Sequence, residues 1–405
     1  MNLKIKIILI NISLTLSGLL LIGFILEYQF QSDRKNFETS WPAKHYRGIG
    51  WHFEPGKKVK WTNHSSYWQE TTANELGFLD RPGVNKRHAS GLCNVAFLGD
   101  SFVEAAQIPI EKKAHVVLER LAEESSALKK LRTSAFAYSG TGQVTQKPFF
   151  DNYIIPLKPD ILVMVVVSND ISDNSPILTS IRNGWHPAFS PRPFYKRDDN
   201  NQLKYHLDHP EWAANLLREP NSSFIKNLAI WKRFGVNFTS KHNITDPIIE
   251  SRVEKILNFG LGDHITDGIE EIKTHLDIDH RFRHQPVDLE AVAITKHVFN
   301  YYQRISEEMG TKIIIVYNYE IIGDKSNKII LNQANQRRQI FSEIGNDLKI
   351  PIIFMDDGEL ISLKKIGQVL LKNDGHWSIH GHSEVAEKVL SFILRNKEFC
   401  QHRNM

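Results

Sequence analysis

The sequence predicts an α/β protein: a three-layer α/β/α sandwich with a central parallel sheet. Short apolar runs of strand length recur along the chain, and the clearest of them is Ile161 to Val167. This run is entirely apolar and mostly β-branched, as expected for a strand that is buried on both faces of a parallel sheet. Longer stretches with apolar residues at helical spacing lie between the runs, and such alternation of strands and helices is typical of a parallel sheet covered by helices.

Five strands and four helices follow from these patterns. The strands are expected at residues 95–98, 132–138, 161–167, 312–318 and 351–355. The helices are expected at 111–124, 290–309, 332–348 and 383–395. In the first helix, apolar residues at 117, 118, 121 and 122 form one face between charged positions.

The amino terminus predicts a membrane anchor. Ile7 to Leu26 is a run of 20 uncharged residues preceded by Lys4 and Lys6, and this length can cross a bilayer as a helix. We favour an uncleaved signal anchor over a cleaved signal peptide, because no convincing small-x-small site follows Leu26. The basic flank should stay in the cytoplasm. We therefore expect a single-pass inner-membrane protein whose main domain lies in the periplasm or outside the cell.

The rest of the chain is expected to form one main domain, residues 91–397, preceded by an extended segment, residues 36–90, that packs on it. The short tail and anchor then occupy residues 1–35. Within the segment, Asn74 to Asp80 has the composition of a turn between two short strands.

Residues 172–286 break the α/β pattern and are too long for a structureless loop, so we expect an insertion with its own helices, near 224–234 and 247–259. We interpret its aromatic residues Trp185, Phe194, Tyr195 and Trp212 as core residues rather than as a sugar platform.

Composition excludes several classes of function. A net charge of +4 over 405 residues, without a Lys/Arg run interleaved with aromatics, argues against a nucleic-acid partner. The two cysteines, Cys93 and Cys400, lack the spacing of a metal site, and we favour two thiols over a disulfide. No His-Glu-x-x-His motif and no phosphate-binding glycine loop followed by Lys is present. We expect neither a metal nor a cofactor.

The strand at 95–98 ends in Gly99-Asp100-Ser101, which places a serine where open α/β sheets hold their ligands and chemistry. Ser101 is therefore a candidate nucleophile. A serine needs a base, an acid that orients the base, and donors for the oxyanion. Three later loops offer such groups: Ser139 to Gln143, Ser168 to Asp170, and Asp374 to His376.

Four motifs in order resemble the blocks of the SGNH (GDSL-like) hydrolase superfamily: G-D-S-F-V-E from Gly99, S-G-T-G-Q from Ser139, V-S-N-D from Val167, and D-G-H-W-S-I-H-G-H from Asp374. The resemblance covers nearly the whole exported part. The upstream N-E-L-G-F-L-D from Asn74 also resembles membrane-anchored or secreted bacterial members.

The resemblance implies a flavodoxin-like sheet and a serine hydrolase. Its catalytic residues would be Ser101 as nucleophile, His376 as base and Asp374 as the acid that orients the base. Its oxyanion hole would comprise the Ser101 amide, the Gly140 amide and the Asn169 side chain.

Three departures from the family pattern leave alternatives. The family's acid usually stands three residues before the histidine, where this chain has Asn373. We keep Asp374, with a backbone carbonyl as the alternative partner of His376. Val167 replaces a glycine of the third block, and Gly142 competes with Gly140 for the oxyanion role.

Four polar residues near these motifs receive structural interpretations. We expect Asp100 to organise the serine turn, and Glu104 to cap the following helix or, alternatively, to contact the substrate. His380 and His382 are expected to pack at the start of the last helix.

We expect an exported serine esterase that hydrolyses O-acyl esters, above all O-acetyl groups, on a cell-envelope carbohydrate. The alternative is an O-acyltransferase that modifies a surface polysaccharide with the same residues, because the two activities differ only in whether water or a sugar hydroxyl reaches the acyl-enzyme. A non-catalytic envelope scaffold is a third hypothesis, against which the intact Ser, Asn and His set argues.

Overall fold

The structure is a computed structural model, and it describes residues 39–46, 49–62, 68–84, 91–125, 131–175, 192–207, 289–318, 328–356, 368–371 and 374–400, with four isolated residues before these. Most of the described residues belong to one compact unit, made of Ser40–Trp61, Gln69–Arg218 and Ile244–Met405. The fold and the site below are those of this unit.

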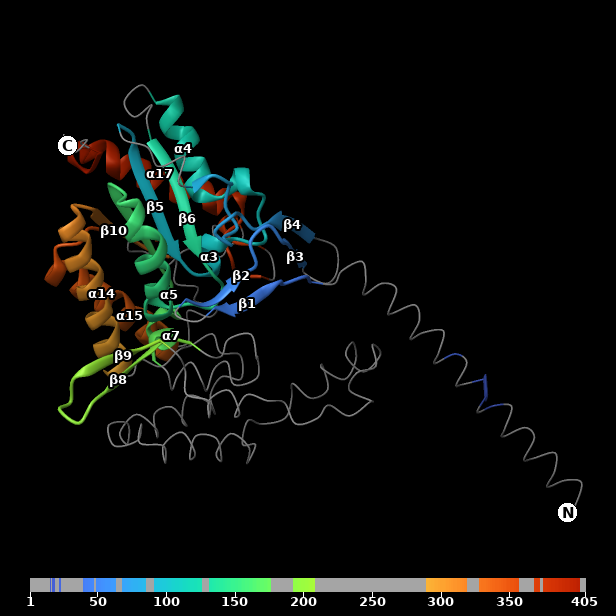
Figure 1. The fold of residues 1–405 in the computed structure, drawn as a ribbon, viewed down its shortest axis with the longest axis horizontal. Helices are drawn as coiled ribbons and strands as arrows, with labels where there is room; N and C mark the ends of the chain where they lie inside the picture. Colours follow the sequence, from blue (N-terminus) through green and yellow to red (C-terminus); the bar gives the residue numbers. More distant parts are fainter. Residues whose placement is uncertain are drawn as a thin grey trace, which may run out of the picture. The chain divides into compact units, whose positions relative to one another are not determined.

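The unit is built on a five-stranded sheet with the order β11-β10-β7-β5-β6. Its strands are β5 (Cys93–Gly99), β6 (Leu131–Ala137), β7 (Ile161–Val166), β10 (Lys312–Tyr317) and β11 (Ile352–Phe354). Every neighbouring pair is parallel, which confirms the predicted sheet (Figure 1). Because β5 lies between β6 and β7, the carboxyl ends of these three strands are adjacent.

Helices cover both faces of the sheet, as predicted. On one face lie α4 (Ala114–Glu124) and α17 (Ile379–Arg395); on the other lie α5 (Gln143–Phe149), α14 (Leu289–Met309) and α15 (Lys328–Leu348) (Figure 1). Alternate side chains of β5 enter the two cores: Val95 and Phe97 pack with α4 and α17, whereas Ala96 and Leu98 pack with the opposite helices. A fully buried aliphatic or Phe side chain stabilises the fold by about 1.5–3 kcal/mol, so both cores hold the strands in register.

Several helical segments were not predicted from periodicity. A continuous stretch joins α5, a π-helical turn at Phe150–Ile154 and α6 (Ile155–Leu157). Pro148 lies inside α5, and a proline is a signal that normally argues against a helix. The turns α3 (Ser101–Glu104) and α7 (Asp170–Asn174), and a 3-10 turn at Ile110–Lys112, are too short to show a period.

The segment before β5 contributes two pairs of strands. β1 (Ala43–Tyr46) is antiparallel to β2 (Gly50–Phe53), and β3 (Lys58–Thr62) pairs with β4 (Trp68–Thr72). The predicted turn at Asn74 follows β4, where Asn74 Oδ1 accepts hydrogen bonds from the amides of Leu76 (3.0 Å) and Phe78 (2.9 Å). A coil rather than a second strand follows this turn as far as residue 84. Phe78 packs edge-on against the rings of Phe136 and Phe149 and so joins the segment to the core.

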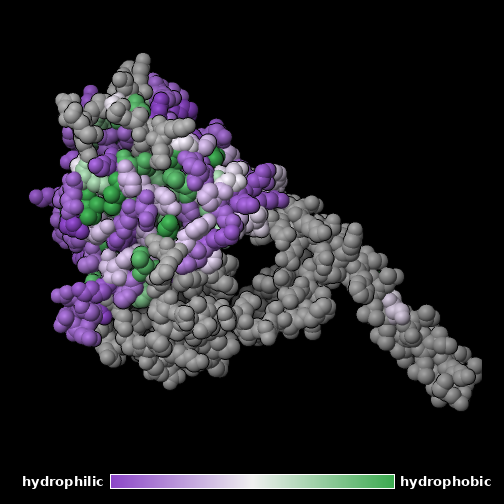
Figure 2. Space-filling model, viewed as in Figure 1, coloured by the Kyte–Doolittle hydropathy of each residue, from purple (hydrophilic) through white to green (hydrophobic). Residues whose placement is uncertain are grey.

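Of the predicted insertion, the structure describes a hairpin, β8 (Phe194–Arg197) and β9 (Leu203–His206). Phe194 and Tyr195 are buried, which supports their interpretation as core residues, and the exposed side of the hairpin is hydrophilic (Figure 2). Trp185, Trp212 and the helices expected near 224–234 and 247–259 lie outside the described residues.

Nearly all of the predicted anchor, residues 7–26, also lies outside the described residues. Among the residues that are described, the structure contains no helix with the length and apolar character needed to span a bilayer.

The structure corrects the interpretation of the two cysteines, because Cys93 and Cys400 form a disulfide. Cys93 begins β5, and Cys400 ends the 3-10 turn that follows α17 (Lys397–Cys400). The two residues are 307 positions apart, so their proximity depends on the packing of α17 and was not visible in the sequence.

We predict that loss of this disulfide destabilises the fold. A disulfide that closes a long loop restricts the unfolded chain and typically contributes about 2–4 kcal/mol. The double variant Cys93→Ala/Cys400→Ala should therefore unfold at lower denaturant concentration than the oxidised protein, measured by far-UV circular dichroism in urea. Dithiothreitol should lower the stability of the wild type and leave that of the double variant unchanged. Equal stability of the wild type and the double variant in the absence of dithiothreitol would contradict the prediction.

Candidate active site

Ser101 lies where β5 gives way to α3, at the carboxyl edge of the sheet. It is the first residue of α3, and Asp100 is the N-cap, whose Oδ1 accepts a hydrogen bond from the Phe102 amide at 3.0 Å. Asp100 thus organises the serine turn, as expected from the sequence. The Ser101 side chain is partly exposed, so a substrate can reach it.

The structure brings the three predicted catalytic residues together. The Ser101 Oγ lies 2.8 Å from His376 Nε2, which is hydrogen-bonding distance. The other imidazole nitrogen, Nδ1, contacts Asp374 Oδ1, and the same oxygen accepts the His376 amide at 3.2 Å. The side-chain contact to Nδ1 thus comes from the Asp374 carboxylate, which favours it over a backbone carbonyl as the orienting partner. Asn373 lies outside the described residues.

Packing fixes the loop that carries His376. Trp377 is fully buried, and its Nε1 donates to Asn318 Oδ1 at 2.7 Å just beyond β10. The Phe102 ring lies 4.9 Å from the imidazole and 5.3 Å from the Trp377 ring, measured between centroids. His382 is buried and accepts the Ala114 amide at 3.2 Å, whereas His380 is exposed. The packing role expected of both histidines thus belongs to His382.

One neighbour of the imidazole was not predicted. Gln107 is buried, and its Nε2 lies 3.1 Å from His376 Nδ1. This residue stands in the irregular connection between α3 and the 3-10 turn at Ile110–Lys112, six positions after Ser101. No periodicity or charge pattern marks such a position in the sequence.

Electrostatics raise the pKa of His376 above its ordinary value of 6.5. Burial by itself lowers this pKa, but the hydrogen bond and charge of Asp374, with smaller contributions from the carboxylates of Asp100 and Glu104, outweigh it. The imidazolium is thereby stabilised, which favours removal of a proton from Ser101.

Sheet topology places the predicted oxyanion residues on either side of Ser101. Gly140 follows β6 by three residues and Asn169 follows β7 by three, and β6 and β7 are the two neighbours of β5. The Asn169 Nδ2 donates to Asp173 Oδ2 at 2.6 Å, which fixes the direction of its amide group. A primary amide has a second N–H, which can serve an oxyanion.

The choice between Gly140 and Gly142 follows from their surroundings. Gly142 has extended backbone angles and is the N-cap of α5, where an added Cβ would lie 2.7 Å from Asn174 Oδ1. Close packing on α7 therefore explains this glycine. Gly140 has φ = +68°, a conformation that favours glycine and turns the loop sharply after β6. Gly140 remains the candidate oxyanion donor.

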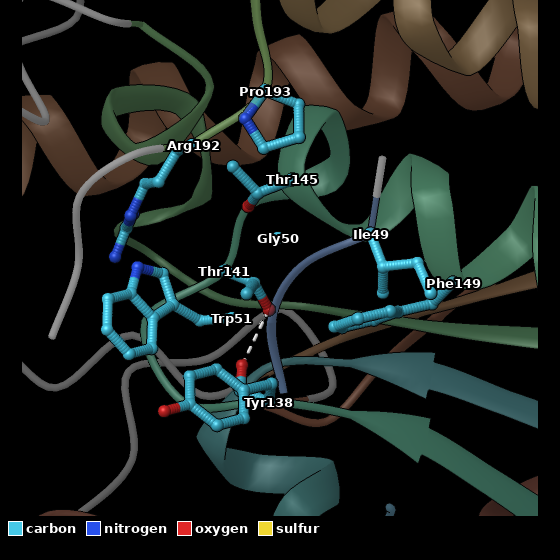
Figure 3. A pocket seen from close by; sticks show the side chains of 9 residues that line it. All are labelled: Ile49, Gly50, Trp51, Tyr138, Thr141, Thr145, Phe149, Arg192 and Pro193. Atoms are coloured by element: carbon cyan, nitrogen blue, oxygen red, sulfur yellow. Dashed lines mark hydrogen bonds between the residues drawn. The ribbon is translucent and has the colours of Figure 1, made fainter. Parts of the chain in front are cut away.

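A pocket of about 20 Å³ lies beside this loop (Figure 3). Thr141 and Tyr138 line it from the loop side, and the Thr141 hydroxyl donates to the Tyr138 carbonyl at 2.6 Å. The other lining residues are Ile49, Gly50, Trp51, Thr145, Phe149, Arg192 and Pro193. This volume suits one water-sized group. A sugar ring would not fit in it.

Within the described ranges, no group of three or more His, Cys, Asp or Glu side chains is placed to hold a metal ion. The chemistry of a Ser-His-Asp set needs none. The expectation that no metal or cofactor takes part stays a prediction.

Comparison with known proteins finds similarity among solved structures. No family model and no curated protein matches the chain. A catalytic variant of Axe2, an acetylxylan esterase from Geobacillus stearothermophilus, is 12% identical, with a TM-score of 0.39, over 75% of this chain and 95% of that chain. A protein assigned to the lipolytic G-D-S-L family, from Desulfitobacterium hafniense DCB-2, is 10% identical, with a TM-score of 0.37, over 74% and 98%. LAE5, an alpha/beta hydrolase from the metagenome of Lake Arreo, is 10% identical, with a TM-score of 0.38, over 75% and 96%.

Among these three, the protein from Desulfitobacterium hafniense carries the name of the G-D-S-L family, which the sequence motifs resemble. Because the identities are 10–12% and the TM-scores lie below 0.5, we base the assignment of chemistry on this chain's own side chains.

The contact of Asp374 with His376 predicts unequal effects of two neighbouring substitutions. Asp374→Asn keeps the shape of the side chain but removes the charge that stabilises the imidazolium, so ester turnover should fall by about four orders of magnitude, as in comparable triads. Asn373→Ala should be mild. With His376→Ala as the reference for complete loss, a severe Asn373→Ala defect beside a loss of tenfold or less in Asp374→Asn would overturn the assignment.

The same variants have a predicted pH dependence. His376 acts as a base only when neutral, so kcat/KM of the wild type should rise with pH through a midpoint above 6.5. Asp374→Asn removes the main group that raises this pKa, while burial continues to lower it, so the midpoint of the residual activity should shift to lower pH. An unchanged midpoint would contradict the electrostatic role of Asp374.

Proposed function

We propose that this protein is a serine esterase that cleaves O-acyl esters through a covalent acyl-enzyme. The observation that carries the proposal is the placement of Ser101 Oγ at 2.8 Å from His376 Nε2, with Asp374 on the opposite side of the imidazole. The nucleophile thus contacts the base, and the base contacts the orienting acid. The residues of this site are partly exposed to solvent.

In the first half of the reaction, Ser101 Oγ attacks the ester carbonyl while its proton moves to His376 Nε2. The carbonyl π electrons pass to the oxygen, and the Ser101 amide, the Gly140 amide and the Asn169 side chain donate to this oxyanion; removing one such donor typically costs about 3–4 kcal/mol. Collapse of the intermediate breaks the bond to the alcohol, which leaves with the proton from His376. Water then attacks the acyl-enzyme with His376 again as base, and the carboxylic acid and free Ser101 are released.

We further propose that the substrate is an O-acetylated carbohydrate of the cell envelope. Two features support this location: the uncharged run from Ile7 to Leu26 has the length of a signal anchor, and the Cys93–Cys400 disulfide is typical of proteins outside the cytosol. The domain beyond the anchor would then face the periplasm or the outside of the cell.

A product analysis tests the function directly. The full chain in detergent, with p-nitrophenyl acetate and an unacetylated oligosaccharide, should release nitrophenol and acetate, identified by mass. Ser101→Ala should lose this turnover with a nearly unchanged thermal midpoint, because it removes one oxygen at a partly exposed turn. Ser391→Ala, an exposed serine of α17, is the matched control and should behave like the wild type.

Two results would change the assignment. Acetylated oligosaccharide as the main product would identify an acyltransferase that uses the same acyl-enzyme. Normal turnover in Ser101→Ala would remove the nucleophile and favour a scaffold.

The proposed anchor has its own test. A chain that begins at residue 36 lacks the only long uncharged apolar run in the sequence and should stay in the supernatant after ultracentrifugation of a cell lysate, whereas the full chain should sediment with membranes. If the shortened chain still sediments after a high-salt wash, a second membrane-binding element exists.

A further inference from the structure

Glu104 is a buried carboxylate next to the nucleophile that the reaction itself does not use. It is the last residue of α3, one helical turn after Ser101, and only 2% of its surface is exposed. Its Oε2 accepts the backbone amide of Ser139 at 2.7 Å, and its Oε1 accepts the Ser139 hydroxyl at 2.7 Å. Both carboxylate oxygens are thus engaged by a single residue of the loop after β6.

Ser139 directly precedes Gly140, the candidate oxyanion donor. With φ = +68°, Gly140 lies in a turn whose direction is not set by a strand or helix. Glu104 belongs to the same helix as Ser101, and its two hydrogen bonds to Ser139 restrain this turn. The contact is possible because α3 lies against β6 (Figure 1). The carboxylate therefore couples the position of Ser101 to that of the Gly140 amide.

This arrangement is costly for the fold, which argues that it does more than fill space. Burial raises the pKa of Glu104 to about 7, although the hydrogen bonds from Ser139 and the charges of Lys113 and His376 lower it. Lys113 is fully buried nearby, where its Nζ donates to the carbonyls of Glu104 (2.6 Å) and Leu79 (2.7 Å), and burial lowers its pKa to about 8. Buried acidic and basic side chains usually cost more than an apolar pair of the same size.

We propose that Glu104 is a positioning residue, which holds Ser139 so that the Gly140 amide faces the oxyanion formed on Ser101. The inference deepens the proposed function and rests on it. The cap expected of Glu104 is not observed, because Lys113 is the N-cap of α4 without a side-chain cap hydrogen bond, and the Glu104 carboxylate accepts from Ser139 instead. A contact of Glu104 with the substrate stays a prediction.

The test compares Glu104→Ala, Glu104→Gln and the exposed control Glu111→Gln in the full chain, with kcat and KM for p-nitrophenyl acetate. Glu104→Ala frees the loop and should lower kcat about 10–100-fold, with KM within about twofold, because the oxyanion exists only after attack. Glu104→Gln can still accept from the Ser139 amide and donate to its hydroxyl, so it should recover to within about fivefold of the wild type. Glu111→Gln should equal the wild type.

A trifluoromethyl ketone supplies a readout of the oxyanion itself. The Ser101 oxygen adds to its carbonyl carbon, the Ser101 proton moves to His376, and the former carbonyl oxygen becomes the anion. The inhibition constant of the ketone for Glu104→Ala should rise by the same factor as the kcat of this variant falls. If Glu104 contributes to stability alone, Glu104→Ala should lower the thermal midpoint, and the inhibition constant should not rise in proportion to the loss of kcat.

Each outcome decides for or against the proposal. Three outcomes would overturn the positioning role: an unchanged kcat in Glu104→Ala, an unchanged affinity of this variant for the ketone, or a Glu104→Gln variant as impaired as Glu104→Ala. The proposed function would still stand if the wild type is active and Ser101→Ala is not. An inactive wild type would overturn both. If Glu104→Ala fails to fold, Ser139→Ala takes its place: it removes one of the two hydrogen bonds and should lower kcat about two- to tenfold with an unchanged KM.

Discussion

The parallel pairing of β5 with β6 on one side and β7 on the other is the constraint on which the site depends. Register aligns Gly99 with Ala137 and Leu98 with Met164, so the three strands end at one edge. The residues that follow them are Ser101, Gly140 and Asn169. A shift of the register by one residue would move each side chain of a strand to the core on the opposite face of the sheet. The close packing of both cores opposes such a shift. The hydrophobic cores therefore fix the relative positions of three loops that lie far apart in the sequence.

Beyond the strand ends, carboxylates take over from the cores in setting positions. Asp374 holds His376, Glu104 holds the loop before Gly140, and Asp173 holds the side chain of Asn169. Irregular loops leave backbone amides and side-chain donors without ladder partners, and a carboxylate satisfies them more strongly than a neutral acceptor. Negative charge beside a developing oxyanion is unfavourable, but in the proposed reaction the imidazolium of His376 forms in the same step, and Lys113 lies buried beside Glu104. The gain in preorganisation must exceed this repulsion for the arrangement to assist catalysis.

The sequence predicted what depends on local pattern. The five strands, the long helices and the strand-end residues Ser101, Gly140 and Asn169 carry signals in apolar runs and in the motifs that follow them. Features that depend on tertiary packing were missed: the pairing of Cys93 with Cys400 spans nearly the whole domain, and Gln107 reaches the imidazole from a connection without periodicity. The helix α5 was hidden because Pro148 contradicts its local propensity while burial on the sheet outweighs that cost.

The short spacing between acid and base has a local physical explanation. Asp374 and His376 are separated by Gly375 alone, and Gly375 has φ = +87°. This left-handed turn brings the Asp374 side chain back over its own loop, where Oδ1 contacts both the amide and Nδ1 of His376. An added Cβ at Gly375 would meet no atom within 4 Å, so the glycine is required by backbone conformation and not by crowding. An acid two residues before the histidine therefore reaches the imidazole because the residue between them is free to adopt positive φ, which makes Gly375 part of the Asp374 assignment.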